Sequence, residues 1–278
     1  MLECSDMDTD KSYLMENLEE ILRLEIKTDP EAVRKQARWC GLKPGLRVLD
    51  AGCGPGKVTS ILYEMIQPGG TILGVDYSEA RIKHAEKHYG KGSDIAFQIH
   101  DLREPLDGMG SFDLIWIRFV LEFNRTESFD IVKNLTAVLR PGGWLCLLDL
   151  DHNCLNHYKL PQDLEDIVFR LMRKLENEYN LDPYSGRKLY SFLYDLGYEK
   201  IGMELMAHHL IYGVMKQEDV FNWMKKGEVS SLKTRDLFQD YPGGHDAFVA
   251  AFTEFLHDPR RFIYTPLILC KGIKPLSP

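Results

Sequence analysis

Three glycines stand at alternate positions in the stretch Asp50-Ala51-Gly52-Cys53-Gly54-Pro55-Gly56, which follows a short apolar run and precedes a predicted helix. Glycine lets the backbone approach a bound group closely and adopt positive φ, and the first turn of the helix presents free N–H groups. The stretch therefore predicts a loop that binds a nucleotide-like ligand. A tight strand-to-helix turn that uses glycine only for packing is the alternative.

Two common nucleotide loops do not fit this stretch. A dinucleotide loop requires its third glycine one position later, where the chain has Lys57. A Walker A loop requires Ser or Thr after its lysine, but Lys57 is followed by Val58. The form that remains is Asp-x-Gly-x-Gly-x-Gly.

Acidic residues follow the next two predicted strands. Asp76 ends the strand predicted over 71–76, and a carboxylate there can accept hydrogen bonds from two ribose hydroxyls. Its alternative role is that of a solvated residue capping the helix that Ser78 begins. Asp101 follows the strand predicted over 95–99, with a surface turn as the alternative.

The order of these motifs resembles class I S-adenosylmethionine-dependent methyltransferases that act on small molecules. The strand 112–117 and Leu139-Arg140-Pro141-Gly142-Gly143 match the family's fourth strand and the turn before its fifth. The resemblance is strong over 31–153 and weaker over 187–206. It implies S-adenosylmethionine as the cofactor, bound by the loop residues Asp50, Gly52, Cys53, Gly54 and Gly56.

The resemblance also implies which residues surround the nucleoside. Asp76 would bind the ribose, and Tyr77 would pack on the adenine ring. Asp101 would accept the adenine amino group, and the backbone N–H of Leu102 would meet a ring nitrogen.

Two further residues are expected near the cofactor. Arg118 would reach the cofactor carboxylate or an acidic acceptor; a charge at the strand end that pairs with Glu122 is the alternative. Tyr13 begins an acidic helix predicted over 12–27. In similar small-molecule methyltransferases such N-terminal helices often fold over the cofactor, although this helix would pack equally well on the sheet edge.

The residues after the fourth and fifth strands indicate which kind of acceptor receives the methyl group. The Asn- or Asp-Pro-Pro-aromatic tetrad that suits nucleobase amines is absent, and many small-molecule members carry His where this chain has Glu122-Phe123. The candidate catalytic residues are Glu122 and His152, the latter because an imidazole transfers protons near neutral pH. For His152, a satisfied polar residue at a strand end is the alternative. No metal is expected, since Arg118 stands where catechol-type members need an additional Asp.

The charge of the chain is concentrated at one end. Of its 278 residues with net charge −8, residues 1–31 carry ten acidic and three basic side chains, so that the other 247 residues are nearly neutral. A strongly basic nucleic-acid binder is therefore excluded. No run of about 18 apolar residues predicts a membrane span, the N-terminus does not resemble a signal peptide, and the six cysteines form no C-x-x-C pair. A cytoplasmic location is expected.

Strands and helices alternate from about residue 47 to 150, which predicts a parallel sheet covered on both faces. The resemblance implies a Rossmann-like α/β fold with seven strands in the order 3-2-1-4-5-7-6 and strand 7 antiparallel. We divide the chain into an acidic N-terminal helix or flap (1–30), a cofactor-binding core (31–158), a helical cover (159–186), the core completion (187–206), a second helical cover (207–261), and the last core strand with its tail (262–278).

The expected function is S-adenosylmethionine-dependent methyl transfer to a small molecule, mainly by proximity and orientation. A nicotinamide-dependent oxidoreductase is an alternative that the missing third glycine disfavours. A non-catalytic methyltransferase-like scaffold and a macromolecular methyltransferase are the remaining alternatives.

Overall fold

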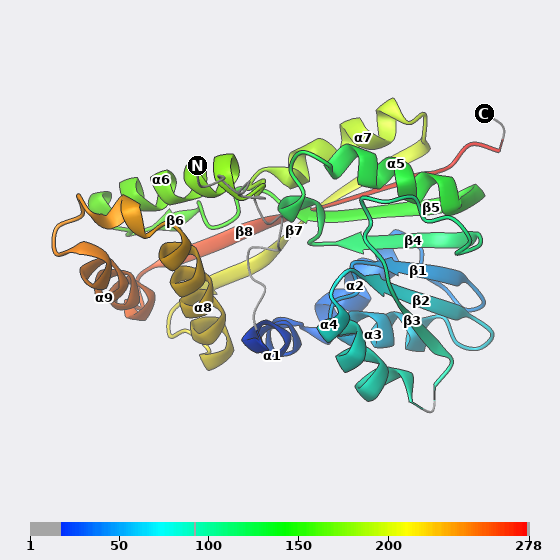
Figure 1. Ribbon diagram of the computed structural model, residues 1–278, viewed down its shortest axis with the longest axis horizontal. Helices are drawn as coiled ribbons and strands as arrows, with labels where there is room; N and C mark the ends of the chain where they lie inside the picture. The colour runs from blue at the N-terminus through cyan, green and yellow to red at the C-terminus, as the bar shows by residue number, and fades with distance from the viewer. Residues whose placement is uncertain (1–17, 92, 277–278) are drawn as a thin grey trace, which may run out of the picture.

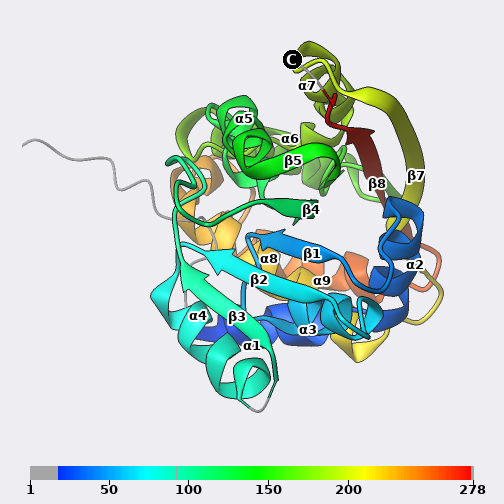
Figure 2. The ribbon, with the colours of Figure 1, turned by 90° about the vertical axis from the view of Figure 1, so that its right-hand side faces the viewer.

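The computed structural model describes residues 18–91 and 93–276. Their strands form one mixed sheet in the order β3-β2-β1-β4-β5-β8-β6, with β7 also paired to β8 (Figures 1 and 2). The strands are β1 (Arg47–Ala51), β2 (Thr71–Asp76), β3 (Ile95–Ile99), β4 (Phe112–Arg118), β5 (Leu139–Leu150), β6 (His157–Tyr158), β7 (Glu199–Tyr212) and β8 (Phe262–Ile273).

The predicted strand order is confirmed. Strands β1 to β5 are parallel, and β8 lies antiparallel between β5 and β7. The short β6 is an addition that pairs with the start of β8. With β6 set aside, β7 and β8 are the sixth and seventh strands of the expected sheet.

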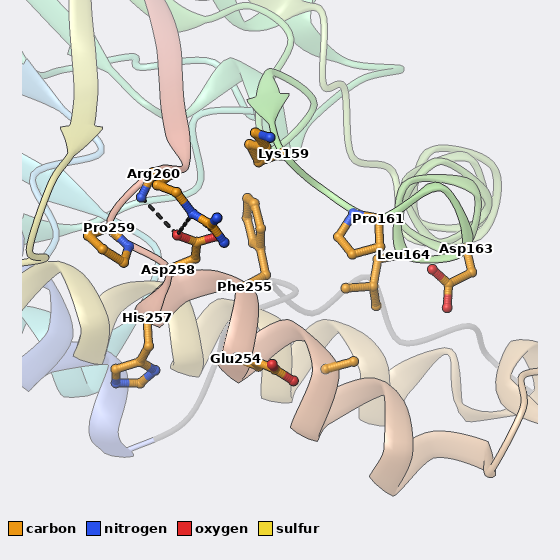
Figure 3. A pocket seen from close by; sticks show the side chains of 11 residues that line it. Lys159, Pro161, Asp163, Leu164, Glu254, Phe255, His257, Asp258, Pro259 and Arg260 are labelled. Atoms are coloured by element: carbon orange, nitrogen blue, oxygen red, sulfur yellow. Dashed lines mark hydrogen bonds and ion pairs between the residues drawn. The ribbon is translucent and has the colours of Figure 1, made fainter.

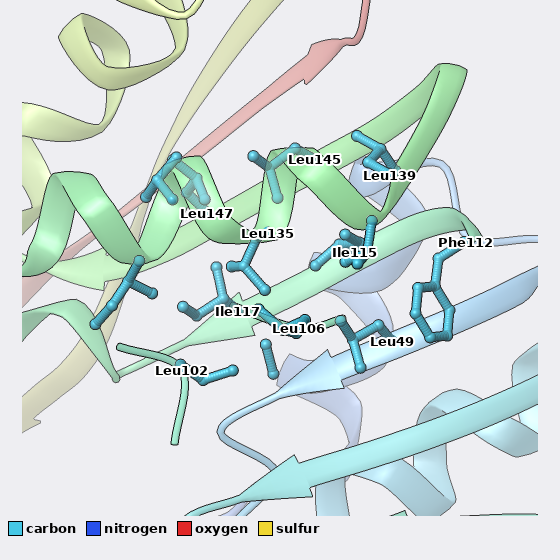
Figure 4. Close-up of a cluster of buried hydrophobic side chains, with 14 of the residues drawn as sticks. Leu49, Leu102, Leu106, Phe112, Ile115, Ile117, Leu135, Leu139, Leu145 and Leu147 are labelled. Carbon is cyan, nitrogen blue, oxygen red and sulfur yellow. The ribbon is translucent and has the colours of Figure 1, made fainter. Parts of the chain in front are cut away.

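Strand β4 illustrates why both faces of the sheet are covered. Successive side chains of a strand point to opposite faces. Leu114 and Trp116 join the apolar cluster on one face, whereas Ile115 and Ile117 join the cluster on the other, and all four side chains are buried. Figure 4 shows the second cluster, in which Leu135 of the covering helix lies over Ile115 and Ile117.

Helices pack on both faces of the parallel part of the sheet (Figures 1 and 2). One face carries α2 (Pro30–Cys40), α3 (Lys57–Met65) and α4 (Glu79–Ala85), and the other carries α5 (Ser128–Val138) and α7 (Leu189–Asp195). Helix α2 has a start that its local sequence favours: the carboxylate of Asp29 accepts the backbone N–H of Glu31 at 2.9 Å, and Pro30 occupies the first helical position.

Strands β7 and β8 extend beyond the core and connect it to a second layer of helices (Figure 1). There α6 (Gln162–Glu178), α8 (Gln217–Lys233) and α9 (Gly244–His257) pack around their own apolar cluster, which includes Trp223 and Phe248. The second cover was expected to begin at residue 207. Instead β7 continues to Tyr212, because it stays paired with β8 as far as Phe262, and the helical part begins at Gln217.

Helix α1 (Leu18–Lys27) lies between the core and α8 (Figure 1). Its buried Arg23 pairs with Glu20 at 2.6 Å and donates to the Oδ1 atom of Asn222 on α8 at 2.7 Å. On the core side, Glu25 accepts the hydroxyl of Tyr89 at 2.8 Å. These bonds attach α1 to both neighbours. Residues 12–17 of the predicted helix, with Tyr13, lie outside the described residues.

Within the described residues, no helix combines the length and the apolar character needed to cross a membrane.

Candidate functional site

A cavity of about 770 Å³ lies at the carboxyl ends of β1, β2, β3 and β4. Its wall consists of the glycine loop, the residues that follow β2, β3 and β4, the end of α1, and residues 178–180. The strand order reverses between β1 and β4, and ligands of open α/β sheets bind at such a switch point. The cavity is therefore the candidate cofactor site.

The glycine loop forms the floor of the cavity through Gly52, Cys53 and Gly54. The N–H groups of Gly52 and Cys53 donate to the Val75 carbonyl at 2.8 and 2.9 Å, which holds the loop against β2. Gly52 has φ +77°, and a Cβ atom there would lie 2.2 Å from Cγ2 of Val120. Only glycine fits this position without displacing the cavity wall.

Two of the expected loop residues do not line the cavity. Gly56 precedes α3 with φ +94°, and a Cβ atom there would lie 2.8 Å from that of Ala85, so this glycine permits close packing against α4. Asp50 is buried below the loop, where it accepts the hydroxyl of Thr59 at 2.6 Å. Both residues support the loop from behind.

Burial raises the pKa of Asp50 to about 7, although the Thr59 hydrogen bond and the charge of Arg118 act in the opposite direction. A carboxyl group with a raised pKa stabilises the fold below its unfolded pKa, near 4, and this stabilisation is lost as the pH rises through about 7. The free energy of unfolding of Asp50→Asn, measured relative to that of the wild type, should therefore be higher at pH 8 than at pH 5. Each unit by which the pKa is raised within this pH range contributes about 1.4 kcal/mol to the difference.

Urea unfolding of the wild type and of Asp50→Asn at both pH values measures this difference. Asp107→Asn, at an exposed position, is the matched control. A parallel pH dependence of the wild type and Asp50→Asn would contradict the assignment of the raised pKa to Asp50.

Asp76 joins the glycine loop to the end of β2. Its Oδ2 atom accepts the N–H of Gly54 at 2.9 Å, and its Oδ1 atom accepts the N–H of Ser78 at 3.0 Å. Arg81 pairs with the same carboxylate at 3.3 Å and lies 5.4 Å from the ring centroid of Tyr77. Asp76 and Tyr77 both line the cavity, as the sequence predicted for ribose and adenine contacts.

Asp101 and Leu102 line the cavity after β3. The guanidinium of Arg103 holds the Asp101 carboxylate at 2.5 and 2.9 Å, an ion pair that sequence analysis did not foresee. Burial alone would raise the pKa of Asp101, but the hydrogen bonds and charge of Arg103 outweigh it and lower this pKa. Asp101 therefore stays ionised at neutral pH.

Arg118 lines the cavity at the end of β4. Its Nε–H donates to Oε1 of Gln36 at 3.0 Å, and its guanidinium lies 3.9 Å from the ring centroid of Phe119. Burial lowers the pKa of Arg118 to about 10, which leaves it a cation at neutral pH. The alternative of a pair with Glu122 is wrong: Arg118 forms no ion pair within the described part of the chain.

Neither catalytic candidate lines the cavity. Glu122 is 3% exposed and accepts the amide of Asn153 at 2.6 Å. Burial raises the pKa of Glu122, against the influence of Lys226 and Lys27. His152 packs edge-on against Tyr184, with ring centroids 5.1 Å apart.

The end of α1 contributes Leu24, Lys27 and Thr28 to the cavity wall, none of which sequence analysis identified as a site residue. Burial, followed by the charges of Arg23 and Lys226, lowers the pKa of Lys27 well below its ordinary value. The only signal in the sequence was the apolar spacing of the helix, which predicts a buried stripe but not what that stripe covers.

Leu24 offers a direct test of whether α1 covers the cofactor site. We expect Leu24→Ala to weaken binding of S-adenosylhomocysteine about 5- to 10-fold, because roughly 1–1.5 kcal/mol of apolar contact would be lost. Leu22→Ala is the matched control on the same helix, since Leu22 is 53% exposed. Isothermal titration measures both affinities, and equal affinities would show that α1 does not contact the ligand.

A second cavity, of about 520 Å³, lies among the cover elements (Figure 3). Phe255 and Leu164 contribute its apolar wall, and Arg260 is paired with Asp258 at 2.8 Å. It contains none of the residues that the sequence motifs identify. We therefore place the functional site at the glycine loop.

Comparison with known proteins agrees with this placement. Residues 48–143 match the family described as "Methyltransferase domain". The chain is 32% identical over 128 residues to demethylmenaquinone methyltransferase of Lactococcus lactis, covering 45% of this chain and 50% of that protein. It is 28% identical over 141 residues to trans-aconitate 2-methyltransferase of Delftia acidovorans, covering 50% and 47%.

The chain thus spans about half the length of the curated relatives it matches. Among solved structures, phosphoethanolamine N-methyltransferase 2 of Haemonchus contortus, in complex with S-adenosylhomocysteine, superposes with a TM-score of 0.56 at 16% identity, covering 92% of this chain and 57% of that one. That likeness concerns the fold. The glycine loop and Asp76 lie within residues 48–143, the stretch that matches the family model.

Proposed function

We propose that this protein is an S-adenosylmethionine-dependent methyltransferase that acts on a small molecule. The observation that carries the proposal is the hydrogen bond from Gly54 to Asp76, which brings the glycine loop and the acidic end of β2 to one cavity. The names of the two curated relatives, which refer to demethylmenaquinone and trans-aconitate, support a small-molecule acceptor. A cytoplasmic location is part of the same proposal.

The wall residues fit this cofactor. Asp76 lines the cavity at the end of β2, where a carboxylate can bind a ribose hydroxyl. Tyr77, 40% exposed, offers its ring to the adenine, and Asp101 with the N–H of Leu102 would bind the adenine edge. Arg118 would bind the cofactor carboxylate or an acidic acceptor through the guanidinium N–H groups that Gln36 does not engage.

When bound, the cofactor supplies a methyl group on a sulfonium, and the thioether is a good leaving group. The chain therefore needs mainly to align the acceptor and to exclude water. Helix α1 and residues 178–180 also line the cavity and would help to enclose the ligand. A general base is required only if the acceptor arrives protonated, and we assign this role neither to Glu122 nor to His152, because neither lines the cavity.

Isothermal titration of the full chain with S-adenosylhomocysteine and with NAD⁺ tests the proposal. We expect one S-adenosylhomocysteine site and no NAD⁺ binding. Transfer of a labelled methyl group from S-adenosylmethionine to a small-molecule extract should then occur with the wild type and cease with Gly52→Ala. Binding of NAD⁺ alone would indicate an oxidoreductase, and cofactor binding without any transfer would indicate a scaffold.

A further inference from the structure

The carboxylates of the cavity wall are already paired with cations. Asp76 pairs with Arg81 at 3.3 Å, Asp101 with Arg103 at 2.5 Å, and Glu178 with Lys174 at 3.3 Å. The wall therefore offers no carboxylate that lacks a cationic neighbour within the described residues.

Two cations of the same wall differ from this pattern. Lys27 and Arg118 form no ion pair with any described residue, although both line the cavity. They also flank one aromatic ring: the Nζ atom of Lys27 lies 5.4 Å, and the guanidinium carbon of Arg118 lies 3.9 Å, from the centroid of Phe119. They come from α1 and β4, which are distant in the sequence and meet only in the folded chain.

Charges of both signs surround these two residues. Arg23 and Lys226 act on Lys27 against Glu20 and Glu122, whereas the charges that act on Arg118 are those of the carboxylates Asp50, Asp149, Asp29 and Glu122. Glu20 is already bound to Arg23. The imidazole of His208 packs on Phe119 as well, with ring centroids 4.6 Å apart, and burial lowers the pKa of His208, so that it adds no positive charge at neutral pH.

We propose that the methyl acceptor is an anion, bearing a carboxylate or a phosphate, and that Lys27 and Arg118 bind it beside Phe119. This inference rests on the proposed function. Arg118 stays a cation at neutral pH but forms no ion pair with a described residue, and an uncharged acceptor would leave it without one, which is costly for a partly buried charge. An anionic acceptor would pair with Arg118, match the planar donors of its guanidinium and favour the protonated form of Lys27, whose pKa burial lowers.

The test is isothermal titration of the full chain saturated with S-adenosylhomocysteine. The probes are succinate, inorganic phosphate and succinamide, the last being the uncharged counterpart of succinate. We expect succinate or phosphate to bind at one site and succinamide not to bind. The anion that binds more tightly indicates whether the acceptor carries a carboxylate or a phosphate.

Lys27→Met and Arg118→Met should each weaken anion binding at least tenfold, and Lys27→Arg should retain it. Lys35→Met, which removes an exposed charge from α2, is the control and should not change it. Circular dichroism verifies that each variant is folded, and Lys27→Gln or Arg118→Gln replaces the corresponding Met variant if that variant is not. Equal binding of succinamide and succinate, absence of anion binding, or anion binding insensitive to both substitutions would overturn the inference. Failure of the wild type to bind S-adenosylhomocysteine would instead refute the proposed function.

Discussion

Gly52→Ala is expected to reduce the affinity for S-adenosylhomocysteine at least 100-fold, which corresponds to about 2.7 kcal/mol. Two costs combine at this position. Alanine at φ +77° is strained by about 1 kcal/mol, and its Cβ atom would lie 2.2 Å from Cγ2 of Val120. Since Val120 itself lines the cavity, either the loop or the opposite wall must move, and both movements change the space that the cofactor would occupy.

A glycine with the same backbone geometry but open surroundings provides the control. Gly69 has φ +84°, and a Cβ atom there would have no neighbour within 4 Å. It precedes β2, at the end of the sheet away from the cavity. Gly69→Ala should lower the free energy of unfolding by about 1 kcal/mol and leave the affinity unchanged. Equal affinities of folded Gly52→Ala and the wild type would refute the role of the loop in binding.

Asp76→Asn is expected to weaken S-adenosylhomocysteine binding at least 30-fold. Whichever way the new amide is turned, its NH₂ group faces either the N–H of Gly54 or that of Ser78, both of which now donate to the carboxylate. Charge-assisted bonds from the ribose, about 1.5–3 kcal/mol each, would also be lost. Buried Arg81 would lose its counter-charge, which should lower the free energy of unfolding by about 3 kcal/mol.

Asp113→Asn is the matched control at the opposite end of the sheet. Asp113 likewise accepts a backbone N–H, that of Arg47 at 2.8 Å, and pairs with an arginine, Arg140, at 2.6 Å. Because Arg140 is 54% exposed, losing this pair should cost about 1 kcal/mol or less and leave affinity unchanged. Isothermal titration with S-adenosylhomocysteine measures the affinity of both folded variants. An unaltered affinity of Asp76→Asn would exclude the ribose assignment.

Local patterns were sufficient to predict the core of the fold. The apolar run of β4 predicted a strand buried on both faces, because every side chain of such a strand meets an apolar neighbour. The start of α2, where Asp29 caps the helix and Pro30 occupies its first position, depends on equally local sequence. For the end of β7 the pattern was insufficient, since the pairing of Tyr212 with Phe262 joins residues fifty positions apart.

The residues of the candidate site likewise fall into those that local sequence predicted and those that it did not. Its loop and acidic residues were predictable, because the ends of parallel strands meet at one edge of a sheet. Glu122 and His152 follow strands in the same way, yet neither lines the cavity: Glu122 is buried against Asn153, and His152 packs against Tyr184. The partner of Arg118 proved to be Gln36, on a helix 82 positions earlier in the chain.

By itself, the sequence determined the strand order through its motifs, the position of the glycine loop, and the concentration of acidic residues near the N-terminus. Only the tertiary structure decided what two of those acidic residues do: Glu20 binds Arg23 beside α8, and Glu25 accepts a hydrogen bond from Tyr89 of the core. It also decided that Lys27 of the same helix lines the cavity. The physical reason is range. Backbone conformation and helix capping depend on neighbours within a few residues, whereas the burial, pairing and charge state of a side chain depend on groups that packing brings from elsewhere in the chain.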